Sequence, residues 1–353
     1  MSLSTAPILL FPTHYLGNLV LGLPWVIRVL ESHPDALVVL DARFASLAAM
    51  VLEADSNVLY YPRAQLAGRK PFFSRLRHYL RFLAALRRHR HRPLLDLEGE
   101  RFTGVLAWLS GSAERVGPVG KHAERFYTRV LELDYHRHRF NAFGEVCAGF
   151  YQGAPPASAL PFTVTEEIAA SLAAKLPQLD TQARWVAIHP GASVDYKLWS
   201  QAYFVELVQR LQEQGMRVIW VGAGAMDAAI IAAIQSRLGD GATLSACDRL
   251  DLPELVALYR RCTCFIGSDS GPMHLAAATG MPVFALFGPS KESIWAPLGA
   301  NSQVLRGSAP CADNCDAHYC EHAYRCLSSL LPAQVLAAVI EQGIATETME
   351  ITE

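Results

Sequence analysis

The sequence predicts an α/β protein made of two doubly wound domains, and three observations lead to this fold class. Strand-like apolar runs alternate with helical stretches along the chain, which is typical of βαβ units and a parallel sheet. The alternation is interrupted once, by a segment rich in proline, alanine and glycine. The chain has 353 residues, which exceeds the length at which a single core usually stops growing. We therefore expect two domains of ordinary size.

The first half begins the alternation at once. Its strand-like runs are APILLFP, ALVVLDA, NVLYYP and PLLDLEG, and helical stretches begin near Leu19 and Pro71. In the second of these helices, Phe72, Leu76, Tyr79, Leu83 and Leu86 recur three or four residues apart, so we expect this face to pack into the domain. The interruption, QGAPPASALP at 152–161, is the predicted linker, and we place the domain boundary between residues 155 and 156.

The second half restarts the pattern with WVAIHPG, RVIWVGAG, ATLSA, CTCFIGSDS and MPVFALFG. Its most informative stretch is 264–290, where a strand, a polar elbow and a short helix precede a second strand and elbow. Pro272 suits the start of this helix, and Gly280 and Pro282 suit its end. A helix N-terminus at the carboxyl end of a strand presents unpaired N–H groups and a positive dipole end. The stretch therefore predicts a site for a phosphate-bearing ligand.

Composition narrows the class of protein further. Half of the residues are apolar and only 18% are charged, which excludes a disordered chain.

The two halves of the chain differ in net charge. Residues 1–160 hold 19 Lys/Arg and 13 Asp/Glu, net +6, and the remaining residues hold 12 and 20, net −8. Ten basic residues and no acid lie between Arg63 and Arg92, which indicates an anionic partner. The acidic second half, with no recognisable binding module, argues against nucleic acid.

The N-terminal region carries no targeting or membrane signal that we recognise. Its apolar runs lack a cationic leader and are interrupted by Pro12, Gly17 and Pro24, so we expect neither a signal peptide nor a transmembrane helix. We expect a cytoplasmic protein, in which thiols stay reduced, and do not interpret the eight cysteines as a disulfide framework.

The segment SDSGPMHLAAATGMPVFALFGPS, at 268–290, closely resembles the signature of glycosyltransferase family 9, the bacterial lipopolysaccharide heptosyltransferases. Three more segments agree in order and spacing: GNLVLGLP at 17–24, DLEG at 96–99 and HPGASVDYKLW at 189–199. The resemblance implies the GT-B fold, two Rossmann-like domains facing a cleft. Residues 1–155 would bind the acceptor and 156–353 the nucleotide sugar. It also implies an inverting, metal-independent transfer of heptose from ADP-L-glycero-D-manno-heptose to the inner core of lipopolysaccharide.

The resemblance also assigns donor-site candidates. Lys197 would contact the diphosphate and stabilise the departing phosphate, although a lone lysine is more often simply solvated. Asp269 would accept hydrogen bonds from sugar hydroxyls, and Ser270 would hold phosphate oxygens; helix capping is the simpler interpretation of both. His274 would bond either the ligand or a buried carbonyl. The remaining donor-binding candidates are Ser193, Gly222, Gly224 and Gly271.

The acceptor-binding candidates are Arg63, Arg75, Arg81 and Glu98. Arginine forks match carboxylates and phosphates bidentately, and acceptors of the family carry Kdo carboxylates and lipid A phosphates at a membrane. The same basic helix is therefore expected to touch the cytoplasmic face of the inner membrane. A solvated, charge-rich helix face is the alternative.

The catalytic candidates are Asn18, His14, Lys197 and Asp269. The family carries a Gly-Asp pair in the first loop, whose Asp is the proposed general base, and the matching pair here is Gly17–Asn18. An amide cannot take a proton but can orient a hydroxyl. His14 is the first expected substitute, because its intrinsic pKa lies near neutrality, and Asp96 is the second.

Four cysteines near the end of the chain, Cys311, Cys315, Cys320 and Cys326, form a C-x3-C-x4-C-x5-C pattern. The spacing departs from the paired C-x2-C of most zinc sites, but related transferases hold iron with a cysteine cluster. A structural zinc or iron ion and packed, reduced thiols both stay open, and we expect no cofactor in the reaction itself. The alternative functions are transfer from another sugar nucleotide, transfer to an autotransporter protein, or binding of a nucleotide sugar without catalysis.

Overall fold

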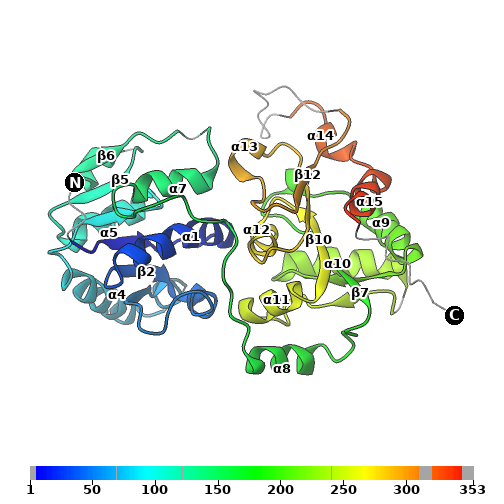
Figure 1. Cartoon of the computed structure of the whole chain (residues 1–353), viewed down its shortest axis with the longest axis horizontal. Helices are drawn as coiled ribbons and strands as arrows, with labels where there is room; N and C mark the ends of the chain where they lie inside the picture. Colours follow the sequence, from blue (N-terminus) through cyan, green and yellow to red (C-terminus); the bar gives the residue numbers. More distant parts are fainter. Residues whose placement is uncertain are drawn as a thin grey trace. The chain divides into compact units, whose positions relative to one another are not determined.

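The computed structural model describes residues 5–68, 70–120, 122–134, 136–239, 241–309 and 320–343. The chain divides into two compact units, Met1–Pro161 and Phe162–Glu353 (Figure 1). This division falls at the far end of the predicted linker. Among the described helices, none combines the length and the apolar character needed to cross a bilayer.

The first unit contains a six-stranded parallel sheet in the order β3-β2-β1-β4-β5-β6. Its strands are β1 (Ile8–Phe11), β2 (Leu37–Asp41), β3 (Val58–Tyr61), β4 (Leu94–Asp96), β5 (Arg115–Pro118) and β6 (Arg129–Leu131). The four predicted apolar runs form β1 to β4. The chain progresses outward in one direction from β1 to β3 and in the other from β4 to β6, so the topological switch point lies between β1 and β4.

Helices cover both faces of this sheet. The longer ones are α1 (Leu16–Ser32), α4 (Phe72–Arg87), α5 (Arg101–Ser110) and α7 (Arg139–Cys147); the short ones are η1 (Ala42–Phe44), α2 (Ala45–Ala48), α3 (Arg63–Leu66) and α6 (Ala123–Phe126). Ile8 and Leu10 of β1 share a buried cluster with Phe82 and Leu86 of α4. On the opposite face, the ring of Phe11 contacts that of Phe143 in α7, with centroids 5.2 Å apart. Burial on both faces explains why the strands are almost uniformly apolar.

The basic helix α4 packs into the domain from Tyr79 onward, as predicted for that residue. Leu83 and Leu86 are buried as predicted, and Phe82 joins them. The prediction was wrong for the start of the helix, where Phe72 is 68% exposed and Leu76 is 37% exposed. Phe73 beside them is 81% exposed. The first turn of α4 therefore presents apolar side chains that nothing in the described domain covers.

The second unit contains another six-stranded parallel sheet, in the order β12-β11-β10-β7-β8-β9. Its strands are β7 (Arg184–His189), β8 (Met216–Trp220), β9 (Leu244–Ser245), β10 (Cys262–Ser268), β11 (Val283–Leu286) and β12 (Ser302–Leu305). Here the switch point lies between β7 and β10. Both sheets thus have the strand order of a Rossmann domain, and two such domains make up the GT-B fold.

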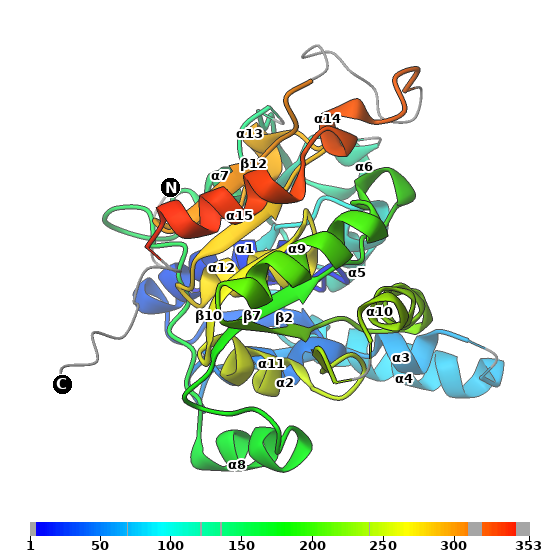
Figure 2. The ribbon, with the colours of Figure 1, turned by 90° about the vertical axis from the view of Figure 1, so that its right-hand side faces the viewer.

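The helices of this unit are α8 (Glu166–Lys175), η2 (Asp195–Lys197), α9 (Gln201–Glu213), α10 (Ala225–Leu238), α11 (Leu252–Tyr259), α12 (Gly271–Ala278), α13 (Glu292–Trp295), α14 (Arg325–Ser328) and α15 (Pro332–Glu341). Figure 2 shows α9 and α15 side by side over one face of the sheet. Phe204 of α9 and Val335 of α15 share a buried cluster with Ile266 of β10. On the other face, Phe265 contacts Tyr259 of α11, with ring centroids 5.7 Å apart. This double covering fixes the carboxyl ends of β7 and β10 at one edge.

Candidate active site

Three of the predicted donor-site residues meet at the switch point of the second sheet. Lys197, in η2 after β7, lies with its Nζ 2.6 Å from Oδ2 of Asp269, which follows β10. The Asp269 side chain is buried, and its Oδ1 lies 4.0 Å from Nε2 of His274 in α12. The paired strands β7 and β10 bring these residues together, because their carboxyl ends are neighbours. The cluster holds one cation and one anion in a partly buried setting.

A second polar network lies beside this ion pair. Ser270 is the N-cap residue of α12, yet its side chain makes no capping hydrogen bond. Its Oγ instead lies 3.1 Å from Nδ1 of His189, the last residue of β7, and Nε2 of that ring lies 3.1 Å from Oδ2 of Asp227 in the first turn of α10. The Ser270 hydroxyl therefore does not cap α12 and contacts His189 instead. The chain Asp227–His189–Ser270 fixes the hydroxyl at the mouth of α12.

The turn between β8 and α10 is built around the Asp227 carboxylate. Burial alone would raise the pKa of Asp227, but His189 and the Ala223 N–H, which donates to Oδ2 at 2.9 Å, hold the pKa below its usual range. A Cβ atom added to Gly191 or Gly222 would collide with this carboxylate. Gly224 has φ +88°, a conformation that L-residues rarely adopt. Gly191 and Gly222 therefore serve the packing around Asp227, and Gly224 serves the backbone of the turn.

Neither His189 nor Asp227 was among the predicted site residues. His189 stands inside the segment that carried the resemblance, so the sequence held a signal for it. The sequence held no such signal for Asp227, because an acidic residue in the first turn of a helix is ordinarily explained by its favourable interaction with the helix dipole. Only the folded structure shows that this acid turns back toward the end of β7.

The elbows also offer hydrogen-bond donors suited to an anion. Gly271 opens α12, whose first N–H groups are available at its N-terminus. The buried hydroxyls of Ser268, the last residue of β10, and Ser290, after β11, have no hydrogen-bond partner within the described protein. Ser193 lies exposed in the loop after β7. Together with Lys197, these groups suit a phosphate-bearing ligand.

The switch point of the first sheet carries a contact between an amide and a carboxyl group. Helix α1 begins at Leu16, earlier than predicted, so Gly17 and Asn18 lie in its first turn. The Asn18 Nδ2 atom lies 3.4 Å from Oε1 of Glu98, which follows β4 and is buried. Burial raises the pKa of Glu98 to about 7; Asp96 adds to the rise, while Arg139, Thr13 and Asn18 oppose it.

The two expected substitutes for the base have different surroundings. Asp96 is fully buried, with Oδ1 accepting from the N–H groups of Glu98 and Gly99 and Oδ2 accepting from the Tyr127 hydroxyl at 2.7 Å. Both of its oxygens therefore serve the fold. His14 is exposed, and its ring lies against Tyr15 with centroids 3.8 Å apart. Partial burial and the neighbouring arginines lower its pKa.

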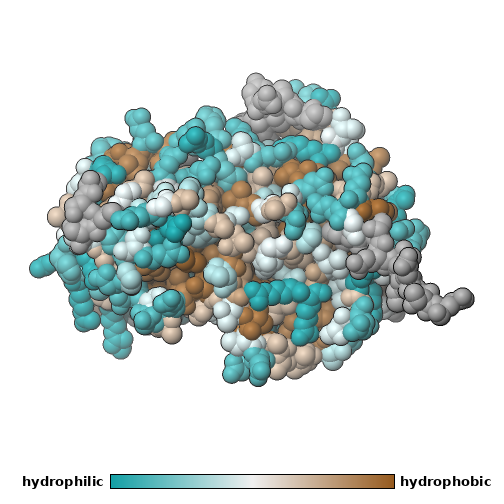
Figure 3. All heavy atoms as spheres, in the orientation of Figure 1, coloured by the Kyte–Doolittle hydropathy of each residue, from teal (hydrophilic) through white to brown (hydrophobic). Residues whose placement is uncertain are grey.

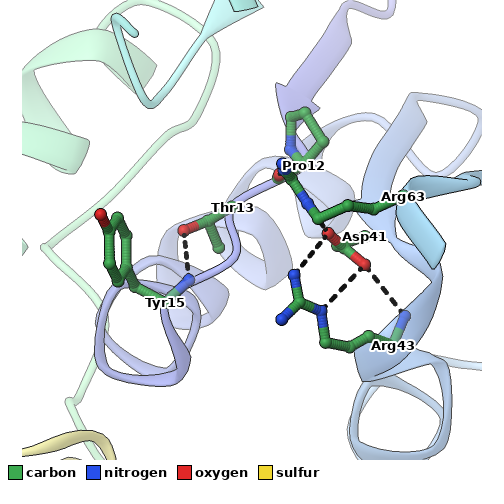
Figure 4. Close-up of polar contacts among 6 residues, drawn as sticks. All are labelled: Pro12, Thr13, Tyr15, Asp41, Arg43 and Arg63. Carbon is green, nitrogen blue, oxygen red and sulfur yellow. Dashed lines mark hydrogen bonds and ion pairs between the residues drawn. The ribbon is translucent and has the colours of Figure 1, made fainter. Parts of the chain in front are cut away.

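Arg63 is anchored within the first domain rather than left free at its surface. Its guanidinium group pairs with the buried Asp41 and donates to the Pro12 carbonyl at 2.7 Å (Figure 4). It also lies over the rings of Tyr61 and Phe102. Arg43 shares the same aspartate at 3.4 Å (Figure 4). The two arginines outnumber the one carboxylate, so this corner keeps a positive charge.

Arg75 and Arg81 are exposed on α4, and neither makes an ion pair with any residue that the structure describes. Figure 3 shows hydrophilic, teal side chains projecting at the lower left, where Figure 1 places α4. This basic surface is therefore unneutralised by the domain that carries it. It remains available to an anionic partner.

Two of the four cysteines of the predicted metal cluster, Cys320 and Cys326, belong to the described residues. Cys311 and Cys315 lie outside the described residues. Cys320 is half-buried and its Sγ accepts a hydrogen bond from the Tyr324 N–H at 3.4 Å, and Cys326 is buried. Within the described ranges, no group of three or more His, Cys, Asp or Glu side chains is arranged to hold a metal. The metal site stays a prediction.

Comparison with known proteins identifies the family of this chain and its fold. The model of glycosyltransferase family 9 (heptosyltransferase) matches residues 79–324. The chain is 22% identical over 298 residues to lipopolysaccharide heptosyltransferase 3 of Escherichia coli K12, covering 81% of this chain and 84% of that protein.

Two solved structures share the fold. The family 9 glycosyltransferase of Veillonella parvula superposes with a TM-score of 0.79 at 20% identity, covering 99% of both chains. The Escherichia coli heptosyltransferase WaaC, solved with ADP, superposes with a TM-score of 0.72 at 18% identity, covering 95% of this chain and 99% of that one. The predicted GT-B fold class is confirmed. Since the family model spans more than half of the chain, the protein belongs to glycosyltransferase family 9, the heptosyltransferase family, and is a glycosyltransferase.

Proposed function

We propose that this enzyme transfers heptose from ADP-L-glycero-D-manno-heptose to the inner core of lipopolysaccharide, with inversion at the anomeric carbon. The observation that carries the proposal is the meeting of Lys197, Asp269 and Ser270 at the second switch point, in a chain of this family. The name of the Escherichia coli relative supports the acceptor, and the ADP bound to WaaC supports the donor nucleotide.

The donor chemistry follows from the groups at that edge. As the bond between the anomeric carbon and phosphate oxygen breaks, negative charge develops on the departing ADP. We propose that the Lys197 ammonium, the Ser270 hydroxyl and the first N–H groups of α12 stabilise this charge, and their contacts at this edge support the proposal. Asp269 orients Lys197 and can accept from sugar hydroxyls. These groups supply the stabilisation that a metal ion gives other transferases, so we propose that the reaction needs no cofactor.

The acceptor would bind to the first domain. Arg75 and Arg81 on α4, the positive corner at Arg63 and the carboxyl group of Glu98 suit an acceptor that carries both anionic groups and hydroxyls. This part of the molecule also offers the exposed Phe72 and Phe73. Because the acceptor is a lipid-linked saccharide, we propose that α4 contacts the cytoplasmic face of the inner membrane, with its aromatic rings entering the interface.

Transfer is tested by incubating the purified protein with ADP-heptose and heptose-deficient lipopolysaccharide core, followed by mass spectrometry of the core. The expected result is a mass increase of one heptose. A product formed only with another sugar nucleotide would contradict the donor assignment, and transfer only to an autotransporter protein would contradict the acceptor. ADP binding without any turnover would instead identify a nucleotide-sugar-binding protein that lacks catalysis.

Membrane contact is tested by co-sedimentation with vesicles of zwitterionic lipid, with and without anionic lipid. The double variant Phe72→Ser/Phe73→Ser should bind anionic vesicles more weakly than the parent does. Trp108→Ser is the matched control, because Trp108 is 57% exposed on α5 of the same domain. The C-cap residue of α5, Gly111, lies next to Arg87, the last residue of α4, and to Arg90 just beyond it, at the end of α4 opposite Phe72. Equal binding by all three proteins would contradict the contact.

A further inference from the structure

The first domain has a carboxyl group whose surroundings differ from those of its neighbours. Glu98 follows β4 and contacts Asn18, which follows β1, so the pair lies at the topological switch point of its sheet. Ligands of open α/β sheets bind at this position. Glu98 is 6% exposed, and its contacts from the Thr13 hydroxyl and the Asn18 amide leave acceptor capacity on a group that offers about four lone-pair sites.

The other acids at this edge are committed to the fold or lie in solvent. Asp41 is buried between Arg43 and Arg63, which hold its negative charge in ion pairs. Asp96 accepts hydrogen bonds from the Tyr127 hydroxyl and from the N–H groups of Glu98 and Gly99, and it has no exposed surface. Glu100 is exposed at the start of α5. Among these four acids, Glu98 alone is buried at the strand ends with acceptor capacity left on its carboxyl group and with no ion-pair partner within the structurally described chain.

We propose that Glu98 is the general base of the transfer reaction and that Asn18 is its positioning residue, an assignment that rests on the proposed function. In the step, the acceptor hydroxyl gives its proton to a Glu98 oxygen while its own oxygen forms the bond to the anomeric carbon. The bond between that carbon and the phosphate oxygen breaks, and ADP leaves with the electron pair. The Asn18 amide donates to the other side of the carboxyl group and fixes its rotamer.

The protonation behaviour of Glu98 fits this role. An efficient general base titrates near the working pH. Burial raises the pKa of Glu98 to about 7, and the charge of Asp96 beneath it adds to the rise. The Arg139 guanidinium and the hydrogen bonds from Thr13 and Asn18 act in the opposite direction. Near neutral pH, a substantial fraction of Glu98 is therefore ionised and able to accept a proton.

The decisive variant is Glu98→Gln, which keeps the size of the side chain and removes the base. We expect heptose transfer to fall by about 10²-fold or more, with ADP affinity unchanged. The parent should show a rise of kcat/KM with pH through an apparent pKa near 7, and the variant should lose that rise. Glu100→Gln is the matched control and should keep both the rate and the pH profile.

An exchange variant separates the base from a structural role. Asn18→Asp/Glu98→Gln keeps one amide and one carboxyl group in contact but moves the carboxyl to the other side, so it should recover at least tenfold of the lost activity. A folded Glu98→Gln variant that transfers heptose at the parental rate would overturn the base assignment while leaving the proposed function intact. A parent that transfers no heptose would instead contradict the proposed function, and the base role with it.

Discussion

The ammonium group of Lys197 lies 2.6 Å from the carboxylate of Asp269, although the two residues are 72 positions apart in the chain. The contact joins the loop after β7 to the elbow after β10, at the edge where open α/β sheets bind ligands. Since Asp269 is buried, Lys197 also neutralises a carboxylate that has little access to water. One side chain thus has a role in the fold and a proposed role in the reaction.

Lys197→Ala should lower both turnover and stability. Losing one preorganised charge at a developing anion costs on the order of 3 kcal/mol, so we expect kcat to fall by about 10²-fold. The melting temperature should fall as well, because Asp269 is left buried without its cation. Steady-state kinetics and thermal unfolding of the same preparation measure the two effects.

Lys175→Ala is the control for this variant. Its Nζ lies 2.7 Å from the buried Glu254, in the same domain, and neither residue belongs to the candidate site. We expect a loss of stability with unchanged kcat. If Lys175→Ala lowered kcat as much as Lys197→Ala, the loss would come from destabilisation of the domain, and Lys197 would have no role in the reaction.

The chain Asp227–His189–Ser270 predicts that a residue outside the phosphate site affects binding of the nucleotide. Asp227→Asn keeps the volume beside Gly191 and Gly222 but removes the charge that orients the His189 ring. Ser270→Ala removes the hydroxyl itself. Each change should weaken ADP binding by about tenfold, as expected for one charge-assisted hydrogen bond.

Because the two residues act through one network, the double variant Asp227→Asn/Ser270→Ala should bind ADP little more weakly than either single variant. Isothermal titration calorimetry measures the four affinities. Asp251→Asn, at the N-cap of α11, should bind ADP like the parent, since asparagine caps a helix as well as aspartate does. Fully additive losses would show that Asp227 does not act through Ser270.

The exposed arginines of α4 predict a charge-dependent affinity for the acceptor. Arg75→Glu/Arg81→Glu should raise KM for the lipopolysaccharide core and leave ADP affinity unchanged, because the two substrates are assigned to different domains. Added salt should have the same effect on the parent, since exposed charges are screened over about 8 Å at physiological ionic strength. Arg210→Glu, on α9 of the second domain, is the control. An equal loss of ADP affinity in the α4 variant would contradict the assignment.

Most of the fold could be predicted because its strands are apolar on both faces. Runs such as LVVLD and VFAL leave little choice of structure. The strands that escaped prediction are β5, β6 and β12, with the sequences RVGP, RVL and SQVL. They are short and contain charged residues, polar residues, glycine or proline, so local propensity does not favour a strand. These three strands form because each one pairs with a neighbouring strand of its sheet.

The site could be predicted less completely than the fold. The motifs identified Lys197, Asp269 and Ser270, but the partners of a side chain depend on three-dimensional packing, as Asp227 shows. The helical period of α4 predicted one apolar face. It could not show where the domain beneath that face ends, and Phe72 lies beyond it. The chemistry of Glu98 likewise depends on burial, which DLEG does not reveal.

Glu98 also predicts how stability depends on pH. Its folded-state pKa of about 7 exceeds the ordinary value of 4.5, so the folded protein favours the protonated form. This contribution to stability is fully present below about pH 4.5 and is lost as the pH rises to about 7. Glu98→Gln lacks the titration. We therefore compare the free energy of unfolding of Glu98→Gln with that of the parent. The difference, variant minus parent, should increase by on the order of 2 kcal/mol between pH 5 and pH 8.

Denaturant unfolding of the parent, Glu98→Gln and Glu100→Gln at the two pH values measures this difference. Comparison with the parent measures the effect of removing the buried carboxyl group, and Glu100→Gln is the control for removing an exposed one. Parallel stability curves for the parent and Glu98→Gln would mean that the carboxyl group titrates at its ordinary pKa. A variant that is more stable than the parent at pH 8 and yet transfers heptose far more slowly would show that this buried carboxyl group destabilises the fold and serves the reaction.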